Sequence, residues 1–321
     1  IDSGYQAALM VPTSILAQQH FKNICIFLEK FNIHCEILTS KDKGSSRLQK
    51  LEKIKSGKID IIIGTHALIQ ESVSFKNIGL VIIDEQHRFG VHQRMAFKNK
   101  GKNPSILVMS ATPIPRTLSL AAYGDMDESR ILEKPIGRLP IITTTLSKNN
   151  EKKLIDKLYI KLKDNEKAYW VCPLIQESEE LDLKAANERF ENLNKIFNGK
   201  VLLIHGQLKE KEKEEIMKKF QNEDFKILVS TTVIEVGIDI KEATTIIIEH
   251  AERFGLAQLH QLRGRVGRSN IQSTCILLHK DEIGENAKKR LQIMKKTNNG
   301  FEIAEKDLEI RGAGEVLGTK Q

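Results

Sequence analysis

Short runs of β-branched and aliphatic residues alternate with longer amphipathic stretches along almost the whole chain. In the first part, the predicted strands are Ala7–Val11, His34–Leu38, Ile59–Ile63, Leu80–Ile83 and Ser105–Met109. Predicted helices lie between them, at Ile15–Phe31 and Arg47–Lys55. Because continuous apolar strands that alternate with helices are typical of parallel sheets covered on both faces, the pattern predicts an α/β fold.

The alternation stops once and then resumes, which predicts two lobes. Residues 133–140 have the sequence Glu-Lys-Pro-Ile-Gly-Arg-Leu-Pro, a proline- and glycine-containing stretch that suits a linker. Beyond it, predicted strands lie at Ala168–Pro173, Lys200–Ile204, Lys226–Ser230, Thr244–Glu249 and Ser273–Leu278, and predicted helices at Glu151–Lys163, Leu183–Phe197, Lys209–Gln221 and Leu256–Val266. We expect a first lobe over 1–133, a linker over 134–147, a second lobe over 148–282 and two tail helices with a glycine-rich end over 283–321.

Composition narrows the classes of function. The 50 Lys and Arg against 42 Asp and Glu give a net charge of +8, which favours an anionic partner. Lysines on solvated helix faces would give the same balance. The four cysteines form no Cys-x-x-Cys pair, which favours a reducing, cytoplasmic compartment and argues against a disulfide frame or a zinc site. No apolar run approaches the roughly 18 residues that a membrane span needs.

The clearest chemical motif follows the predicted strand Leu80–Ile83, where the chain continues Asp84-Glu85-Gln86-His87. Ligands of parallel sheets bind at the carboxyl ends of the strands, so this strand presents two adjacent carboxylates at a binding edge. In nucleotide hydrolases one such carboxylate holds Mg²⁺ through water and the other orients the attacking water. The alternative is an ordinary strand that ends in a polar turn.

Arginines gather in a second motif, Gln261-Leu262-Arg263-Gly264-Arg265-Val266-Gly267-Arg268. Only 13 of the 50 basic residues of the chain are arginines, so three of them within eight positions indicate a need that lysine does not meet. Planar guanidinium groups suit bidentate phosphate contact, and the glycines allow close approach of the backbone. The alternative is a solvated basic helix end.

Smaller signals stand at other strand ends: Thr13, Thr65-His66, Ser110-Ala111-Thr112 and Thr231–Asp239. Each is weak alone, because glycine and threonine are common turn residues. Together with the two motifs above, they resemble the ordered motif series of superfamily 2 helicases. Asp84–His87 is similar to motif II, Ser110–Thr112 to motif III, Thr231–Asp239 to motif V and Gln261–Arg268 to motif VI.

The resemblance narrows to the RecG family of DNA helicases. It rests on Asp84–Val91 with Gln93-Arg94, on Gly64–Gln70, and on a tail of Gly300–Leu308, Arg311-Gly312 and Gly318–Gln321. The transcription-repair coupling factor shares the tail, but its motif II usually has Glu-Gln after Asp-Glu, so we rank it second. Two departures occur. Ser40-Lys41 replaces the usual Gly-Ser after Thr39, and Lys320 stands where arginine is usual.

The resemblance implies two RecA-like parallel-sheet lobes and a C-terminal helical hairpin that couples lobe movement to translocation on duplex DNA. It implies a monomer that uses ATP and Mg²⁺ to remodel branched DNA, such as replication forks and Holliday junctions, in recombination and repair. By this resemblance, the catalytic residues are Asp84 (holding Mg²⁺ through water), Glu85, Arg265 and Arg268, and the ATP-binding residues are Gln86, His87, Gly237 and Asp239. The residues for DNA binding or coupling are Thr13, Thr65, His66, Ser110, Thr112, Arg311 and Gln321.

A phosphate-binding Gly-x-x-x-x-Gly-Lys-[Ser/Thr] loop should precede motif II, but the 321 residues contain none. The chain also opens on Ile1 without an initiator methionine. We interpret the sequence as a segment that begins after this loop and after the N-terminal wedge domain of the family, and we expect the isolated chain to be inactive in ATP hydrolysis. The alternative is that the chain is complete as it stands and is a non-hydrolytic DNA-binding module or a decayed remnant.

Overall fold

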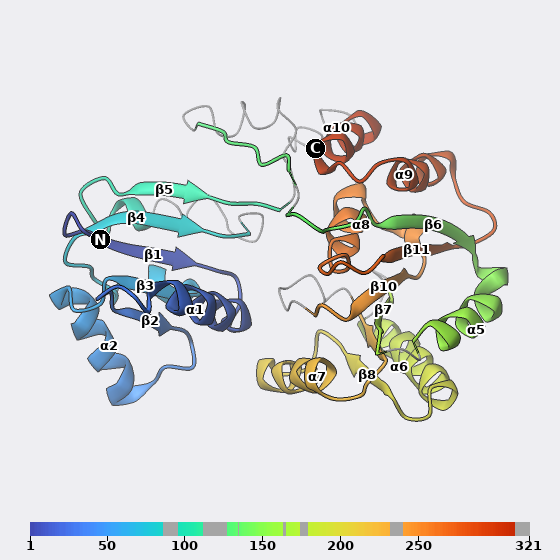
Figure 1. Cartoon of the computed structure of the whole chain (residues 1–321), viewed down its shortest axis with the longest axis horizontal. Coiled ribbons are helices and arrows are strands. Elements are labelled where there is room, and N and C mark those ends of the chain that lie inside the picture. Colours follow the sequence, from blue (N-terminus) through green and yellow to red (C-terminus); the bar gives the residue numbers. More distant parts are fainter. Residues whose placement is uncertain are drawn as a thin grey trace. The chain divides into compact units, whose positions relative to one another are not determined.

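The computed structural model describes residues 1–85, 96–111, 127–133, 135–162, 165–173, 179–231 and 240–311. These residues divide into two compact units (Figure 1). The N-terminal lobe comprises residues 1–111 of the described part, and the C-terminal lobe comprises residues 127–311. Each lobe contains one parallel β-sheet with helices packed against it, which confirms the predicted α/β class with two lobes.

The N-terminal lobe has a five-stranded sheet in the order β2-β3-β1-β4-β5, and every neighbouring pair is parallel. Its strands are β1 (Gln6–Met10), β2 (Cys35–Leu38), β3 (Ile61–Gly64), β4 (Ile78–Ile83) and β5 (Ser105–Val108). Its helices are α1 (Ser14–Leu28), α2 (Gly44–Ser56) and the short 3₁₀ helix η1 (His66–Ile69). All five predicted strands and both predicted helices are present, shifted by a few residues at their ends.

Alternation along the strands decides which helix covers which face. On β1, Leu9 packs in the same cluster as Leu16 and Ala17 of α1, whereas Ala8 packs in the cluster that contains Ile54 of α2. Successive side chains of a strand point to opposite faces, so α1 and α2 lie on opposite sides of the sheet. The predicted coverage of both faces is therefore present around β1.

The C-terminal lobe has a six-stranded parallel sheet in the order β6-β11-β10-β7-β9-β8. Its strands are β6 (Ile142–Ser147), β7 (Lys167–Val171), β8 (Val201–Ile204), β9 (Ile227–Ser230), β10 (Ala243–Ile248) and β11 (Thr274–His279). Its helices are η3 (Lys148–Asn150), α5 (Glu151–Lys161), α6 (Glu179–Ile196), α7 (Glu210–Asn222), η5 (Ala251–Arg253), α8 (Leu256–Arg263), α9 (Glu285–Lys296) and α10 (Gly300–Arg311).

Helices α5 and α6 share a buried cluster with Trp170 of β7. On the other face, the ring of Phe220 of α7 packs against the ring of Tyr169 in a tilted arrangement, with 5.7 Å between the ring centres. The two predicted tail helices are α9 and α10, and α10 packs against both α8 and α9. None of the helices in the described ranges has the length and apolar character that crossing a membrane requires.

Strand β6 corrects one expectation. The sequence pattern places Ile142–Ser147 in the linker over 134–147, but these residues form an edge strand that pairs in parallel with β11. The strand was missed because its sequence, Ile-Thr-Thr-Thr-Leu-Ser, carries no apolar run, and an edge strand that is partly exposed does not need one. The domain limits as a whole stay a prediction.

Candidate functional site

The carboxyl end of β4 holds the two predicted carboxylates. The backbone N–H of Asp84 donates to the carbonyl oxygen of Met10 at 2.9 Å, which attaches the start of the loop to β1. The Oδ1 atom of Asp84 accepts a hydrogen bond from the backbone N–H of Glu85 at 2.9 Å, and its Oδ2 atom lies 3.2 Å from Nε2 of His20 on α1. Both oxygens of Asp84 therefore have partners, and the plane of the carboxylate is set by two separate elements.

Glu85 has an unusual backbone conformation, with φ of 54° in the left-handed region that residues other than glycine rarely adopt. Such a conformation costs about 1–3 kcal/mol and persists only where the surroundings enforce it. Here the hydrogen bond from its N–H to the Asp84 carboxylate supports it. The chain therefore turns at Glu85, and the Glu85 side chain leaves the backbone in a different direction from the one that a continued β-strand would give it.

Four strand ends meet at this edge of the sheet, because β3, β1, β4 and β5 are neighbours in that order and run parallel. Thr13 follows β1, Thr65 and His66 follow β3, and Ser110 follows β5 shortly after Met109, whose N–H donates to the carbonyl oxygen of Ile83 at 2.8 Å. Residues predicted from separate motifs are thus placed along one edge.

The residues of this edge that are predicted to contact DNA differ in how exposed their side chains are. The hydroxyl oxygen of Thr13 accepts from the N–H of Leu16 at 3.4 Å and caps α1. Thr65 is buried, with 8% exposure, whereas His66 and Ser110 are exposed. His66 and Ser110 are therefore the more accessible of the four side chains.

Gly64 explains how the backbone before Thr65 is held. It is the last residue of β3, paired with Leu38 on one side and Met10 on the other. A Cβ atom added to Gly64 would collide with the carbonyl oxygen of Leu38 and would crowd Leu68. Only glycine therefore permits this close approach of strand and loop.

In the C-terminal lobe, the arginine motif ends α8 and forms the following turn. Arg265 and Arg268 are half-buried in this turn, and Nε of Arg268 donates to the carbonyl oxygen of Gly264 at 3.3 Å. Gly267 has φ of +77°, and its N–H donates to Oγ of Ser273 at 3.1 Å. The turn is thus fixed against the loop before β11, and it contains both predicted catalytic arginines.

Arg263, the first arginine of the motif, has a structural role that the motif does not predict. Its side chain is buried at 1% exposure, and its Nη1 atom donates to the carbonyl oxygens of Met294 at 2.7 Å and Thr297 at 2.9 Å. The same atom lies 3.2 Å from the hydroxyl of Thr143, and burial lowers the pKa of the guanidinium. The helical period could have indicated this, because Arg263 lies four residues after the buried Leu259.

A second arginine, Arg189, is largely buried, and no sequence motif points to it. Arg189 of α6 pairs with Glu151 of α5 and with Glu249 after β10, and its guanidinium lies 5.0 Å from the ring centre of Trp170. Burial alone would lower the pKa of Arg189, but the hydrogen bond with Glu151 and the charge of Glu249 raise it above the usual value. Because Glu151 and Glu249 are about 40 to 60 residues away from Arg189 in the chain, no local sequence pattern predicts this network.

Several predicted site residues lie outside the described part of the chain. These are Gln86, His87, Thr112, Gly237, Asp239 and Gln321. Arg311 ends α10, but its side chain is also outside the description. Their predicted roles stay predictions.

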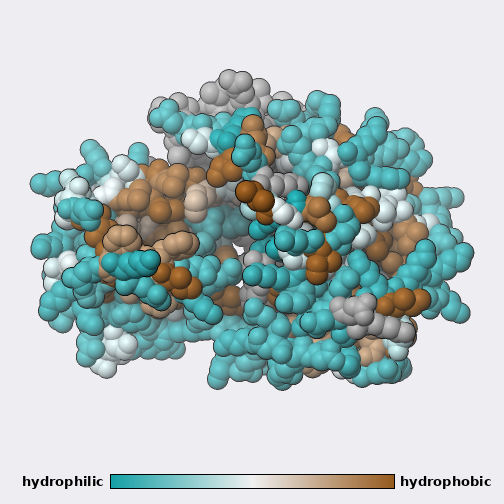
Figure 2. Space-filling model, in the orientation of Figure 1, coloured by the Kyte–Doolittle hydropathy of each residue, from teal (hydrophilic) through white to brown (hydrophobic). Residues whose placement is uncertain are grey.

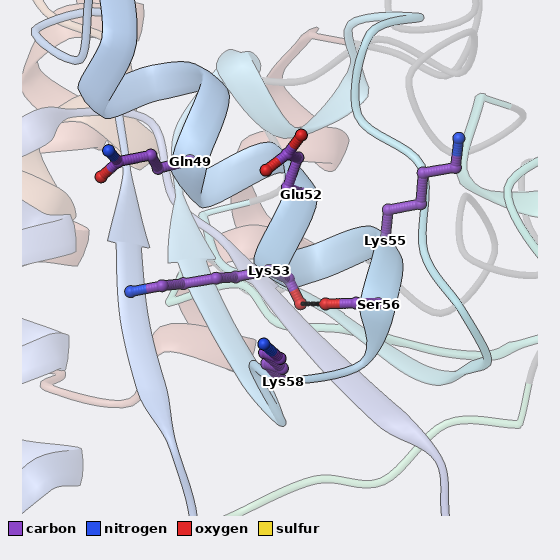
Figure 3. A pocket seen from close by; sticks show the side chains of 6 residues that line it. All are labelled: Gln49, Glu52, Lys53, Lys55, Ser56 and Lys58. Carbon is purple, nitrogen blue, oxygen red and sulfur yellow. Dashed lines mark hydrogen bonds between the residues drawn. The ribbon is translucent and has the colours of Figure 1, made fainter.

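A shallow hollow of about 680 Å³ lies along α2, away from these motifs (Figure 3). It is lined by Gln49, Glu52, Lys53, Lys55, Ser56 and Lys58. Lys58 precedes β3, so the hollow lies toward the amino ends of the strands, opposite to the edge that holds Asp84. It is therefore no part of the candidate site.

Two family models match the chain. The model described as DEAD/DEAH box helicase matches residues 1–120, and the model described as Helicase conserved C-terminal domain matches residues 150–270. The chain is 50% identical over 327 residues to the ATP-dependent DNA helicase RecG of Pasteurella multocida, which covers 100% of this chain and 47% of that protein. The RecG helicase of Bacillus subtilis is 50% identical over 321 residues, with coverage of 99% and 47%. The chain belongs to the RecG family of superfamily 2 helicases.

A solved RecG structure bound to a three-way DNA junction agrees with this assignment. It superposes with a TM-score of 0.81 at 46% identity and covers 98% of this chain and 41% of that one. The chain spans about half the length of the curated RecG relatives it matches. Both lobes and α9–α10 therefore fall within the part that it shares with RecG proteins.

Proposed function

We propose that this chain is the motor of an ATP-dependent DNA helicase that translocates on duplex DNA and remodels branched DNA, such as replication forks and Holliday junctions, in recombination and repair. The observation that carries the proposal is the 46% identity, over 98% of the chain, to a RecG protein described as bound to a three-way DNA junction. The adjacent carboxylates at the end of β4 and the arginine turn after α8 support it, because both suit nucleotide hydrolysis.

The donor chemistry at β4 fits Mg²⁺. Asp84 and Glu85 offer hard carboxylate oxygens, and Mg²⁺ usually takes only one or two carboxylates while keeping waters and substrate phosphates. Bound there, Mg²⁺ would neutralise charge on the β- and γ-phosphates of ATP.

The chain's own residues supply the rest of the proposed mechanism. Asp84 would hold the ion through water, and Glu85 would orient or deprotonate the water that attacks the γ-phosphate. Arg265 and Arg268 would stabilise the charge of the transferring phosphoryl group, a role typically worth about 10³–10⁵ in rate. Gln86, His87, Gly237 and Asp239 are proposed to contact ATP, and Thr13, Thr65, His66, Ser110, Thr112, Arg311 and Gln321 to contact DNA or couple the two sites.

The test is DNA-stimulated ATP hydrolysis by the full-length protein as its gene encodes it, with forked and linear duplexes compared. We expect Glu85→Gln to lower the rate at least about 10²-fold and Arg268→Ala about 10³-fold, while each variant keeps its affinity for DNA. His34→Ala, far along the chain from both motifs, is the matched control. Unchanged hydrolysis in Glu85→Gln would refute the role of that residue.

A test of the 321-residue chain by itself, next to the full-length protein, distinguishes the proposed motor from a non-hydrolytic DNA-binding module. Because it contains no Gly-x-x-x-x-Gly-Lys-[Ser/Thr] motif, we expect negligible ATP hydrolysis together with DNA binding that falls steeply with salt. Turnover by this chain would contradict the expectation. A full-length protein that binds DNA but never hydrolyses ATP would instead favour a non-hydrolytic DNA-binding module.

A further inference from the structure

His20 of α1 contacts the carboxylate of Asp84, although His20 belongs to none of the motifs described above. Its Nε2 atom lies 3.2 Å from Oδ2 of Asp84, although the two residues are 64 positions apart in the chain. A carboxylate only accepts hydrogen bonds, so Nε2 carries the hydrogen and donates it. Side-chain exposure is 31% for His20 and 22% for Asp84, which makes the contact partly shielded from water.

Both partners of this hydrogen bond are attached to rigid elements. Leu16 and Ala17, one turn before His20, are buried at 8% and 0% exposure in a cluster with β1 and β3. Asp84 is held by its N–H, which donates to Met10 of β1. A side chain that projects from a packed helix restricts the orientation of its partner far better than one on a loop does.

The two oxygens of Asp84 are thus held from two sides, Oδ1 by the N–H of Glu85 and Oδ2 by the ring of His20. Groups that hydrogen-bond to metal-binding residues orient them, and their removal typically lowers metal affinity about 10–100-fold. We propose that His20 is a positioning residue that orients the Asp84 carboxylate for a divalent cation. This inference rests on the proposed function, in which Asp84 holds Mg²⁺.

The N-terminal lobe contains a second His–Asp pair that serves as an internal comparison. Nδ1 of His34 lies 3.7 Å from Oδ2 of Asp60, and the His34 side chain is 70% exposed. This pair stands before β2 and β3, at the amino ends of the strands, and neither residue follows a motif strand. His34→Ala therefore removes a histidine that is paired with an aspartate without touching the site.

The direct test measures Mn²⁺ binding to the full-length protein in the presence of ADP, by loss of the electron paramagnetic resonance signal of free Mn²⁺ beyond the loss that the same ADP concentration causes without protein. Asp84→Asn is the reference variant, because it shows how far Mn²⁺ affinity falls when the carboxylate itself is lost. We expect His20→Ala to weaken Mn²⁺ binding about 10-fold. His20→Gln should stay close to the unsubstituted protein, because its amide Nε2 can donate from a similar position, and His34→Ala should not change binding.

A second readout separates positioning from a merely structural effect. In His20→Ala the Mg²⁺ concentration for half-maximal ATP hydrolysis should rise by a similar factor, and the maximal rate should return at saturating Mg²⁺. Thermal unfolding and DNA affinity should match those of His34→Ala.

The outcomes are distinct from those of the proposed function. Mn²⁺ affinity that is unchanged in His20→Ala, or in Asp84→Asn, overturns the inference, and so does a Gln variant as weak as the Ala variant. If the unsubstituted protein shows no DNA-stimulated hydrolysis, the proposed function fails, while the Mn²⁺ titration still decides on His20.

Discussion

The sheets of the two lobes differ in how completely they are covered. In the C-terminal lobe, every residue of β7, β9 and β10 is buried. In the N-terminal lobe, Leu80 of β4 is 38% exposed and Leu107 of β5 is 50% exposed. Figure 2 shows apolar side chains at the surface in this region of the N-terminal lobe.

The register explains which face is open. Ile82 of β4 pairs with Leu107 of β5, and Ile82 belongs to the cluster beneath α1. Leu80, Ile82 and Leu107 therefore share the face on which α1 lies, but α1 covers that face mainly over β1, β2 and β3. An apolar strand sequence therefore predicts burial only where a helix also lies above the strand.

The largest effect on stability is expected for Arg263, whose side chain is buried in the C-terminal lobe. Replacing Arg263 by Ala leaves two carbonyl oxygens and a hydroxyl without their donor inside the C-terminal lobe. We expect a loss of about 3–5 kcal/mol in the free energy of unfolding, from unsatisfied acceptors and from the cavity. Denaturant titration followed by tryptophan fluorescence checks this, because the single tryptophan, Trp170, is buried in this lobe.

Arg263→Lys is the control for that experiment. It keeps a charge and one donor group but lacks the planar fork, so its loss should be intermediate. A transition of Trp170 that does not shift in Arg263→Ala would contradict the view that this side chain holds α8, α9 and β6 together.

A matched pair of strand substitutions tests the difference in coverage directly. Leu228 of β9 is fully buried, so Leu228→Ala should cost about 2–5 kcal/mol. Leu107→Ala removes the same atoms from a half-exposed site and should cost less than about 1.5 kcal/mol. Unfolding of each variant, followed by far-ultraviolet circular dichroism and by Trp170 fluorescence, measures both; equal costs would show that the exposed face of β4 and β5 is covered in solution.

The smallest effect concerns an ion pair in the N-terminal lobe. Asp42 accepts from Nζ of Lys50 and from the N–H of Thr39, each at 2.8 Å. Burial alone would raise the pKa of Asp42, but these donors outweigh it and lower the pKa below its usual value. The pair therefore stabilises the fold above the ordinary pKa, and this contribution disappears as pH falls through the lower pKa of the folded state.

Asp42→Asn should accordingly cost less than about 1 kcal/mol near neutral pH and nothing at strongly acidic pH. Stability curves of both proteins across this range provide the check. If the difference in stability between Asp42→Asn and the unsubstituted protein grew on acidification, the pKa of Asp42 would be raised in the folded state and not lowered.

Local patterns were sufficient for much of the fold. Ile61–Gly64 and Ala243–Ile248 form strands as their apolar residues predict, and most of these residues are buried because helices cover this part of each sheet. Patterns failed for Ile142–Ser147, whose threonines suit an edge strand and give no apolar signal. Of the candidate site, Asp84 and Glu85 were found at the predicted strand end, but the burial of Thr65 depends on packing that periodicity does not report.

The sequence by itself determined the alternation of strands and helices, the two lobes, the motif residues and the RecG resemblance, because all of these depend on residue types at fixed spacings along the chain. Tertiary structure alone decided the strand order that brings the ends of β3, β1, β4 and β5 to one edge. It also decided that His20 contacts Asp84 and that Arg263 is buried while Arg265 and Arg268 are not. The physical reason is that such contacts join residues far apart in sequence, and their free energy exists only once the lobe has packed.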